Sequence, residues 1–478
     1  MKKLLSRYSP KYTTAIVYML QSTEYKAPEY LAWLKRVTNF NQVMYRRTLD
    51  KTKVARMLLL AVRTGTFLQI AIGLLLMYLG LINTNYLLVI IGVTTVLLYP
   101  FIWAYLLVVP LQMGRWLIIN PRYRKQIKLS EKIFNSSKAY KIAVAGSYGK
   151  TSMKELLNTV LSEGKKVVAT PENKNVAISH ARFAKKLTGE EEVLIIEFGE
   201  EEPGDVAAFA KTTHPDIGII TGLAPAHLNS YETLAAAGSD IFSLASYVGP
   251  NNTYVNTESD SVKDFLKPEF NTYNSKHALG WEISNIKIDF SGTSFVMKKG
   301  DDKLVLQSGL MGQHQVGPLA CVAAISHKLG LSKEQIEKGI AKTVAYEHRM
   351  QPRQISGAWV IDDTYNGNIE GMKAGLKLLE QLPGKRKIYV TPGLVDQGEE
   401  NERVHLELGQ AIAAAKPDKV VLMYNSATRF IQNGLDVGSY KGEIQIEHYP
   451  LDYYTNLEHI LAGGDVVLMQ NDWTDNYN

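Results

Sequence analysis

The sequence predicts an α/β protein with two successive sheet domains, preceded by a hydrophobic helical hairpin. Short runs of Val and Ile alternate with helical stretches from about residue 139 onward, which is typical of a parallel sheet covered by helices. A second such series begins near residue 359, and two long uncharged segments precede both series. A chain of 478 residues has room for two or three domains with hydrophobic cores of their own.

The overall composition narrows the function classes. With 46% hydrophobic and 21% charged residues, the chain is neither disordered nor fibrous. Its net charge of +6 is small, and its aromatic residues do not interleave with basic runs, so we expect no nucleic-acid partner. The single cysteine, Cys321, lies in an apolar stretch and cannot form an internal disulfide, which indicates a buried structural thiol.

The first two elements are the uncharged segments Gly65–Ile82 and Tyr86–Leu111, each long enough to span a bilayer as a helix. Some sixty residues precede them, so they are not a cleaved signal peptide. The loop between them carries no charge, whereas both flanks are basic, which places both flanks in the cytoplasm. We therefore expect a basic juxtamembrane segment over 1–64, a transmembrane hairpin over 65–111 and a linker over 112–139; the alternative is a buried helical pair in a soluble domain. The basic residues are Arg46, Arg47, Lys51, Lys53, Arg56 and Arg63 before the hairpin, and Arg115, Arg122, Arg124, Lys125 and Lys128 after it.

The strands come next, in two series. The first series comprises Lys141–Ala145, Glu192–Ile196 and Ile217–Thr221, and the second comprises Trp359–Ile361, Lys387–Thr391, Lys419–Met423 and Asp465–Met469. The residues between them follow helical patterns, so each series predicts one parallel sheet.

A phosphate-binding loop joins the first of these strands to a helix predicted from Met153 to Leu161. Glycines let backbone N–H groups approach phosphate, the helix N-terminus adds partial positive charge, Lys150 reaches the terminal phosphates, and Thr151 can bind Mg²⁺. The pattern is a shortened P-loop, because Val144 stands where the longer form has glycine; a structural turn is the alternative. ATP is the expected nucleotide, since no guanine-reading Asn-Lys-x-Asp element occurs. The loop residues are Gly146, Ser147, Tyr148, Gly149, Lys150, Thr151 and Ser152.

Six motifs in order resemble the Mur ligase family from about Lys141 to the C-terminus, and within it the members that add D-alanyl-D-alanine to a muramoyl tripeptide. The motifs are the phosphate loop with Lys154-Glu155, Thr170–Asn175, Glu197-Phe198-Gly199, Pro225–Leu228, Gly312-Gln313-His314 and Asp362–Asn368. The resemblance implies a P-loop central domain over 140–347 with a parallel sheet and a Rossmann-like C-terminal α/β domain over 348–478.

The same resemblance implies site residues. Glu197 and His227 look like the family's Mg²⁺ ligands, beside Thr151, with Lys150, Glu197 and His227 forming the catalytic set. Glu197 closes an apolar strand, where its carboxylate would emerge at the edge at which parallel sheets bind ligands. The remaining nucleotide-binding residues implied are His314, Arg349, Asp363, Tyr365, Asn366 and Asn368.

Several positions depart from the family pattern. Gly238 stands where members carry a carbamylated lysine that holds a second Mg²⁺, and Asp240 is the nearby oxygen donor. The His-Asn pair and later Asn around the adenine become His314-Gln315 and Pro318, and the usual Lys-Gly-Ser near the C-terminus becomes Gln470-Asn471-Asp472. The membrane hairpin occupies the place of the uridine-nucleotide domain, so a lipid-linked acceptor is a reasonable hypothesis.

The resemblance implies a ligase that uses MgATP to phosphorylate a carboxylate and then forms an amide with an amine. We expect a peptidoglycan-precursor carboxylate and an amino acid or dipeptide amine as substrates, ATP and Mg²⁺ as cofactors, and a monomer at the cytoplasmic membrane with its catalytic domains in the cytoplasm. Two alternatives stay open: a membrane-bound amide ligase outside peptidoglycan, such as a poly-amino-acid synthetase, and a nucleotide-binding scaffold without catalysis.

Overall fold

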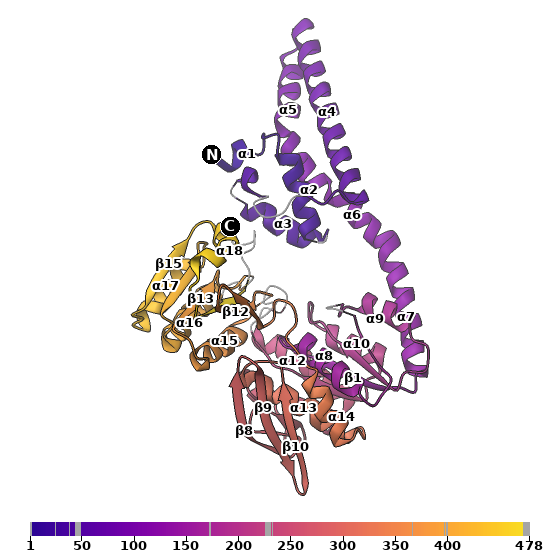
Figure 1. The fold of residues 1–478 in the computed structure, drawn as a ribbon. Helices are drawn as coiled ribbons and strands as arrows, with labels where there is room; N and C mark the ends of the chain where they lie inside the picture. Colours follow the sequence, from indigo (N-terminus) through magenta and orange to yellow (C-terminus); the bar gives the residue numbers. More distant parts are fainter. Residues whose placement is uncertain are drawn as a thin grey trace. The chain divides into compact units, whose positions relative to one another are not determined.

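The computed structural model describes residues 2–23, 25–37, 39–43, 49–171, 174–224, 231, 233–365, 367–395, 397 and 400–471 (Figure 1). The chain divides between Arg124 and Lys125 into two compact units. The first unit is helical, and the second contains two sheets.

The first unit is organised around the antiparallel hairpin of α4 and α5 (Figure 1). Gly73 and Gly92 let the two helices approach closely, because a Cβ at Gly73 would lie 2.9 Å from the carbonyl oxygen of Gly92. Short helices between Lys2 and Gln42 pack into one core with the foot of the hairpin, where the Tyr30 hydroxyl donates to the Ala104 carbonyl at 3.0 Å. The helices are α1 (Lys2–Ser6), α2 (Tyr12–Ser22), α3 (Ala27–Arg36), η1 (Phe40–Gln42), α4 (Lys53–Ile82), α5 (Tyr86–Leu106) and α6 (Val108–Gly114).

The stretch expected to be a linker is helical. After α6, a π-helical turn η2 (Arg115–Ile119) leads into α7 (Asn120–Ser136), so that helix runs from Tyr86 to Ser136. The second uncharged segment is therefore the first part of a longer helical stretch, which ends just before the first strand of the second unit.

The larger sheet of the second unit has the strand order β10-β9-β8-β7-β6-β5-β4-β1-β3-β2. The strands from β2 to β6 are parallel, with β1 paired between β3 and β4, and β7 to β10 extend the sheet in antiparallel fashion. The strands are β1 (Tyr140–Ala145), β2 (Val167–Ala169), β3 (Val193–Glu197), β4 (Ile217–Ile220), β5 (Thr253–Asn256), β6 (Asn271–Tyr273), β7 (His277–Ala278), β8 (Trp281–Asp289), β9 (Gly292–Lys299) and β10 (Asp302–Ser308).

Helices cover both faces of this sheet, so alternate residues of β1 pack into two separate cores. Ile142 and Val144 pack with α8, α13 and α14, whereas Ala143 and Ala145 pack with α9, α10 and α12. Cys321 is fully buried in α13 as a free thiol. The helices are α8 (Lys150–Leu161), α9 (Ala177–Ala184), α10 (Asp205–Thr213), α12 (Leu234–Val248), η3 (Pro250–Asn252), η4 (Asp260–Phe265), η5 (Gln313–Gln315), α13 (Val316–Lys328) and α14 (Lys333–Ala341).

The second sheet has the order β11-β12-β16-β13-β14-β15 and is parallel except for β11. All seven strands predicted from the sequence are present in the two sheets, and the predicted α/β fold is confirmed. The elements are β11 (Gln351–Ile355), β12 (Ala358–Asp363), α15 (Ile369–Gln381), β13 (Arg386–Thr391), α16 (Asn401–Ala415), β14 (Lys419–Met423), α17 (Thr428–Val437), β15 (Glu443–Glu447), α18 (Pro450–Thr455), α19 (Leu457–Ile460) and β16 (Asp465–Gln470).

Candidate active site

The glycine-rich loop lies between β1 and α8, as the sequence predicted. Gly146 and Gly149 both have positive φ, 136° and 73°, and a Cβ at Gly146 would lie 2.4 Å from the Thr221 hydroxyl oxygen. The Ser147 N–H donates to the Gly222 carbonyl at 2.9 Å, and the Thr221 hydroxyl donates to the Tyr148 carbonyl. The end of the neighbouring strand β4 therefore fixes the loop in a shape that glycine alone adopts without strain.

Lys150 opens α8, and its ammonium group is held by the protein itself. The ammonium nitrogen donates to the Gly146 carbonyl at 2.6 Å and to a carboxylate oxygen of Glu200 at 2.8 Å. Glu200 is only 4% exposed, and its burial raises the pKa of its carboxyl to about 7, although Lys150 acts in the opposite direction. Sequence reasoning missed Glu200, since it is the first of three consecutive glutamates and nothing in the sequence marks which of them is buried.

Glu197 ends β3 beside this loop, with its carboxylate buried at 1% exposure. The carboxylate oxygen Oε1 accepts from the Thr151 hydroxyl at 3.0 Å and from the Asn175 amide at 3.2 Å, and Oε2 lies 3.3 Å from the ammonium of Lys154. A carboxylate and a hydroxyl in contact are oxygen donors of the kind that Mg²⁺ prefers, so these two residues fit a magnesium site.

His227, the third residue expected at that site, lies outside the described residues. Within the described part of the chain, no three His, Cys, Asp or Glu side chains form a group that could hold a metal ion.

Gly238 lies against the core of the domain. A Cβ there would lie 2.3 Å from Phe265, so a lysine at this position would have to displace that ring. Asp240, two residues on, makes hydrogen bonds within the domain. Its two carboxylate oxygens accept from the Gly204 N–H at 3.1 Å and from the Tyr231 hydroxyl at 2.8 Å.

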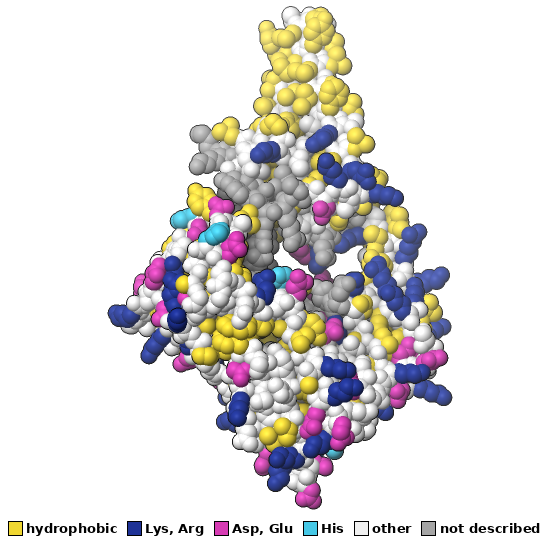
Figure 2. Space-filling model, viewed as in Figure 1, with side chains coloured by type: hydrophobic (Ala, Val, Ile, Leu, Met, Phe, Trp, Pro, Cys, Tyr) yellow, Lys and Arg dark blue, Asp and Glu magenta, His cyan; other side chains and the backbone are white. Residues whose placement is uncertain are grey.

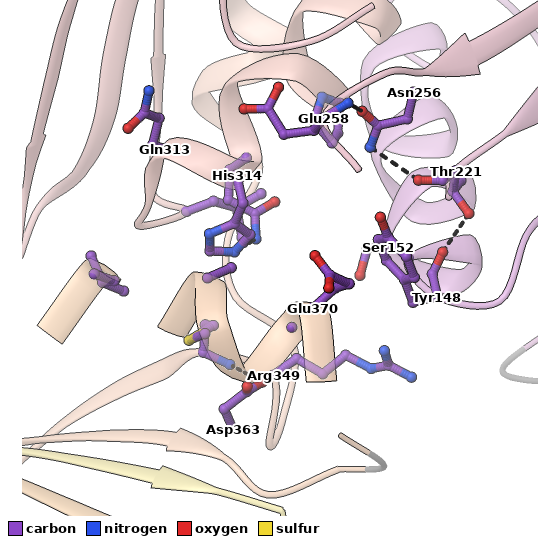
Figure 3. Close-up of a pocket in the computed structure, with 18 of the residues that line it drawn as sticks. Tyr148, Ser152, Thr221, Asn256, Glu258, Gln313, His314, Arg349, Asp363 and Glu370 are labelled. Atoms are coloured by element: carbon purple, nitrogen blue, oxygen red, sulfur yellow. Dashed lines mark hydrogen bonds between the residues drawn. The ribbon is translucent and has the colours of Figure 1, made fainter. Parts of the chain in front are cut away.

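A cavity of about 380 Å³ lies beside the phosphate loop and is lined on its other side by residues that follow residue 348 (Figure 3). The structure brings eight of the predicted site residues together around it. Gly146, Ser147, Lys150, Thr151 and Glu197 are not among its lining residues, and Asn366 lies outside the described ones. The predicted residues that line it are Tyr148, Gly149, Ser152, His314, Arg349, Asp363, Tyr365 and Asn368.

The side chains around the cavity include a neutral histidine and a positively charged arginine. Burial lowers the pKa of His314 to about 4, so its ring is neutral at pH 7, and its Nε2 lies 2.9 Å from the Gln315 amide nitrogen. The guanidinium of Arg349 lies 4.5 Å from the centre of the Tyr365 ring, a cation–π contact. Gln315 and Pro318, two of the departures from the family pattern, also line the cavity.

Asp363 is held from behind by Gln470. Its Oδ2 accepts from the Gln470 amide at 2.8 Å, its Oδ1 accepts from the Met350 N–H at 3.2 Å, and burial raises the pKa of its carboxyl to about 6. Gln470 thus occupies the place of the expected lysine, and its neutral amide is the partner of Asp363. Asn471 follows it and accepts the Gly367 N–H at 3.2 Å, while Asp472 lies outside the described residues.

Comparisons of sequence place two family domains on this structure. Residues 144–326 match the Mur ligase middle domain, and residues 348–470 match the Mur ligase glutamate ligase domain. The UDP-N-acetylmuramoyl-tripeptide--D-alanyl-D-alanine ligase of Escherichia coli (strain K12) is 29% identical over 291 residues, 59% of this chain and 63% of that protein. The enzyme of the same name from Mycobacterium leprae is 26% identical over 362 residues, 69% of this chain and 70% of that one. The chain thus matches less than two thirds of the length of the Escherichia coli relative.

Solved structures have the same fold. MurF from Acinetobacter baumannii aligns with a TM-score of 0.65 and 19% identity, covering 73% of this chain and 77% of that one. MurF ligase from Thermotoga maritima in complex with ADP aligns with a TM-score of 0.64 and 22% identity, covering 73% and 80%. The two matched domains cover well over half of the chain, and its second unit has the fold of these structures; the chain belongs to the Mur ligase family.

Proposed function

We propose that this chain is an ATP-dependent amide ligase of the MurF type, which joins D-alanyl-D-alanine to the carboxylate of a peptidoglycan precursor. The observation that carries the proposal is the cavity between the two family domains, lined by the phosphate loop on one side and by Arg349, Asp363 and Asn368 on the other. The names of the relatives from Escherichia coli and Mycobacterium leprae supply the substrates. We assign the central ATP-binding role to residues 140–347 and the closing role to residues 348–478.

The reaction has two steps. A carboxylate oxygen of the precursor attacks the terminal phosphorus of ATP and releases ADP. The amine then attacks the acyl carbon and displaces phosphate, which carries away the amine proton and leaves an amide. Phosphoryl transfer needs mainly positioning and neutralisation of charge. The loop N–H groups and the Lys150 ammonium bind and orient the phosphates, while the residues after 348 exclude water from the acyl phosphate.

Magnesium fits the donor set beside the loop. Thr151 and Glu197 would hold it, with His227 as a third ligand, and the ion would neutralise phosphate charge. Asn175 and Lys154 already orient the Glu197 carboxylate through the contacts at 3.2 and 3.3 Å.

The hairpin of α4 and α5 anchors the enzyme in the cytoplasmic membrane, with the catalytic domains in the cytoplasm. Both helices are long and apolar enough to cross a bilayer, and most of their large apolar side chains are exposed, which a buried helical pair of a soluble domain would not show. Figure 2 shows hydrophobic side chains covering the visible face of the hairpin, with Lys and Arg side chains gathered near its foot. No acidic residue occurs between Asp50 and Glu131, so the flanks are purely basic. A membrane anchor makes a lipid-linked acceptor the alternative to a nucleotide-linked one.

The activity test uses the full chain in detergent with MgATP, a muramoyl tripeptide and D-alanyl-D-alanine, scored for ADP release and amide product. We expect turnover that requires both substrates and falls about 100-fold or more in Lys150→Ala, because one charged donor to the phosphates is lost. Lys211→Ala, an exposed lysine on α10, is the matched control and should retain full activity. Turnover with a different amino acid would favour the poly-amino-acid reading, and nucleotide binding without turnover would favour the scaffold.

Membrane topology has its own test, made simple because Cys321 is the only cysteine and is buried. A Thr84→Cys variant places an exposed thiol in the hairpin loop. It should react with a membrane-impermeant maleimide added outside intact spheroplasts, whereas the parent chain should not. Labelling that appears only after lysis would contradict the proposed orientation.

A further inference from the structure

We propose that Glu200 is a positioning residue that competes with the nucleotide phosphates for Lys150 and thereby weakens the affinity for ATP and ADP. The inference rests on the proposed ATP-binding function of the loop and adds a device that the family resemblance does not supply. It is carried by the ion pair between Glu200 and Lys150, whose nitrogen and nearest carboxylate oxygen are 2.7 Å apart.

The backbone fixes Glu200 beside the phosphate loop. It follows Gly199, whose N–H donates to the Asn175 carbonyl at 2.9 Å, and a Cβ at Gly199 would lie 3.0 Å from the Asn175 side chain. Phe198, one residue earlier, is fully buried in the core. This short segment is therefore held against its neighbours on both sides, and the Glu200 carboxylate stays at the loop.

The ion pair is largely shielded from water, so breaking it costs more free energy than breaking an exposed pair would. The side chains of Lys150 and Glu200 are only 12% and 3% exposed. An exposed pair contributes little because water screens it, whereas separating a buried pair leaves a carboxylate without its counter-charge. Two of the three Lys150 N–H donors already go to Gly146 and Glu200, so a phosphate group that accepts more than one of them has to displace an existing partner.

Binding of nucleotide also brings like charges together. Phosphate oxygens at the loop would approach the Glu200 carboxylate at the moment when it loses Lys150, and neighbouring like charges disfavour each other. Both effects weaken the binding of ATP and of ADP, since both ligands carry phosphates to the same loop.

Glu197 of the proposed magnesium site pairs with a different lysine of α8, Lys154, and not with Lys150. Lys154 lies one turn after Lys150, is fully buried, and pairs with Glu197 at 3.3 Å and with Glu155 at 3.2 Å. Glu197 keeps its partners Lys154, Thr151 and Asn175 when Glu200 is changed. A substitution at Glu200 therefore tests the lysine without removing the contacts of Glu197.

The test compares binding of MgATP and MgADP to the full chain in detergent by calorimetry, for the parent, Glu200→Gln and Glu201→Gln. Glu201 is the adjacent exposed glutamate, so its variant has the same change of charge without the buried contact. We expect Glu200→Gln to lower both Kd values about tenfold, the lower range for a charge-assisted hydrogen bond released to the ligand. Glu201→Gln should leave them within about twofold of the parent. In turnover, Glu200→Gln should lower KM for ATP without raising kcat, because ADP is retained more tightly as well.

A double variant shows whether Lys150 mediates the effect. In a Lys150→Ala background the gain from Glu200→Gln should shrink to the part that comes from direct repulsion, whereas a gain as large as in the parent background would overturn the competition. Weaker binding in Glu200→Gln, or Kd values equal to those of the parent, would also overturn it. Thermal unfolding checks that the variants are folded, and Glu200→Ala provides a second removal of the carboxylate that should give the same tightening. A parent chain that binds no nucleotide would instead refute the proposed function itself.

Discussion

Replacing Gly238 with alanine sets two effects of known size against each other. Gly238 lies inside α12, where alanine is favoured over glycine by about 1 kcal/mol. The new methyl group would lie 2.3 and 2.5 Å from two ring carbons of Phe265 and 3.0 Å from Leu223, and such overpacking costs about 1–3 kcal/mol. Phe265 is stacked on Phe242 with ring centres 5.0 Å apart, so its ring cannot move away freely. We expect the variant to lose about 0–2 kcal/mol of unfolding free energy.

A second substitution identifies the clash as the cause. Phe265→Leu removes the two ring carbons that the new methyl group would meet, so Gly238→Ala should stabilise the chain by up to about 1 kcal/mol in that background. Urea unfolding of the parent, both single variants and the double variant gives the coupling between the two positions, which we expect to exceed about 1 kcal/mol. Equal effects of Gly238→Ala in both backgrounds, or a full 1 kcal/mol of stabilisation in the parent, would refute the reasoning.

The same geometry disfavours a lysine at position 238 in this structure. A lysine there would bring its chain into the Phe265 contact and its ammonium into an apolar cluster, where an unpaired charge is costly.

Two further predictions concern the C-terminal domain. Burial lowers the pKa of His405, whose Nε2 accepts the Leu394 N–H at 2.8 Å. The unfolded chain therefore binds a proton at this residue at a higher pH than the folded chain does. The contribution of His405 to the free energy of unfolding should be complete above the ordinary histidine pKa and fall as the pH drops below it. His405→Gln cannot titrate, so its Tm should fall less than that of the parent between pH 7.5 and pH 5.5, and equal pH dependence would contradict the assignment. Gln470→Ala should lower the unfolding free energy by about 3 kcal/mol, since Asp363 and the Tyr389 hydroxyl each lose a buried partner; urea unfolding that shows a loss below about 1 kcal/mol would argue against this role.

The amino-acid sequence by itself determined the features that depend on neighbours along the chain. The phosphate loop is one, because the strand, glycine turn and helix are contiguous and the glycines at 146 and 149 need no distant contact to be recognised. The strands of both sheets are another, since short apolar runs between helical stretches mark them, and the two uncharged segments predicted the hairpin helices from length and charge alone.

Tertiary structure decided which side chains meet across long separations. Glu200 reaches Lys150 from 50 positions away, and Gln470 reaches Asp363 from 107 positions away. In the sequence, Glu200 is one of three consecutive glutamates, and Gln470 is noticed only because it replaces the lysine of the usual Lys-Gly-Ser motif. Periodicity records which face of an element is apolar, but the partner of a buried charge depends on how sheets and loops pack, and that packing is fixed only when the whole domain folds.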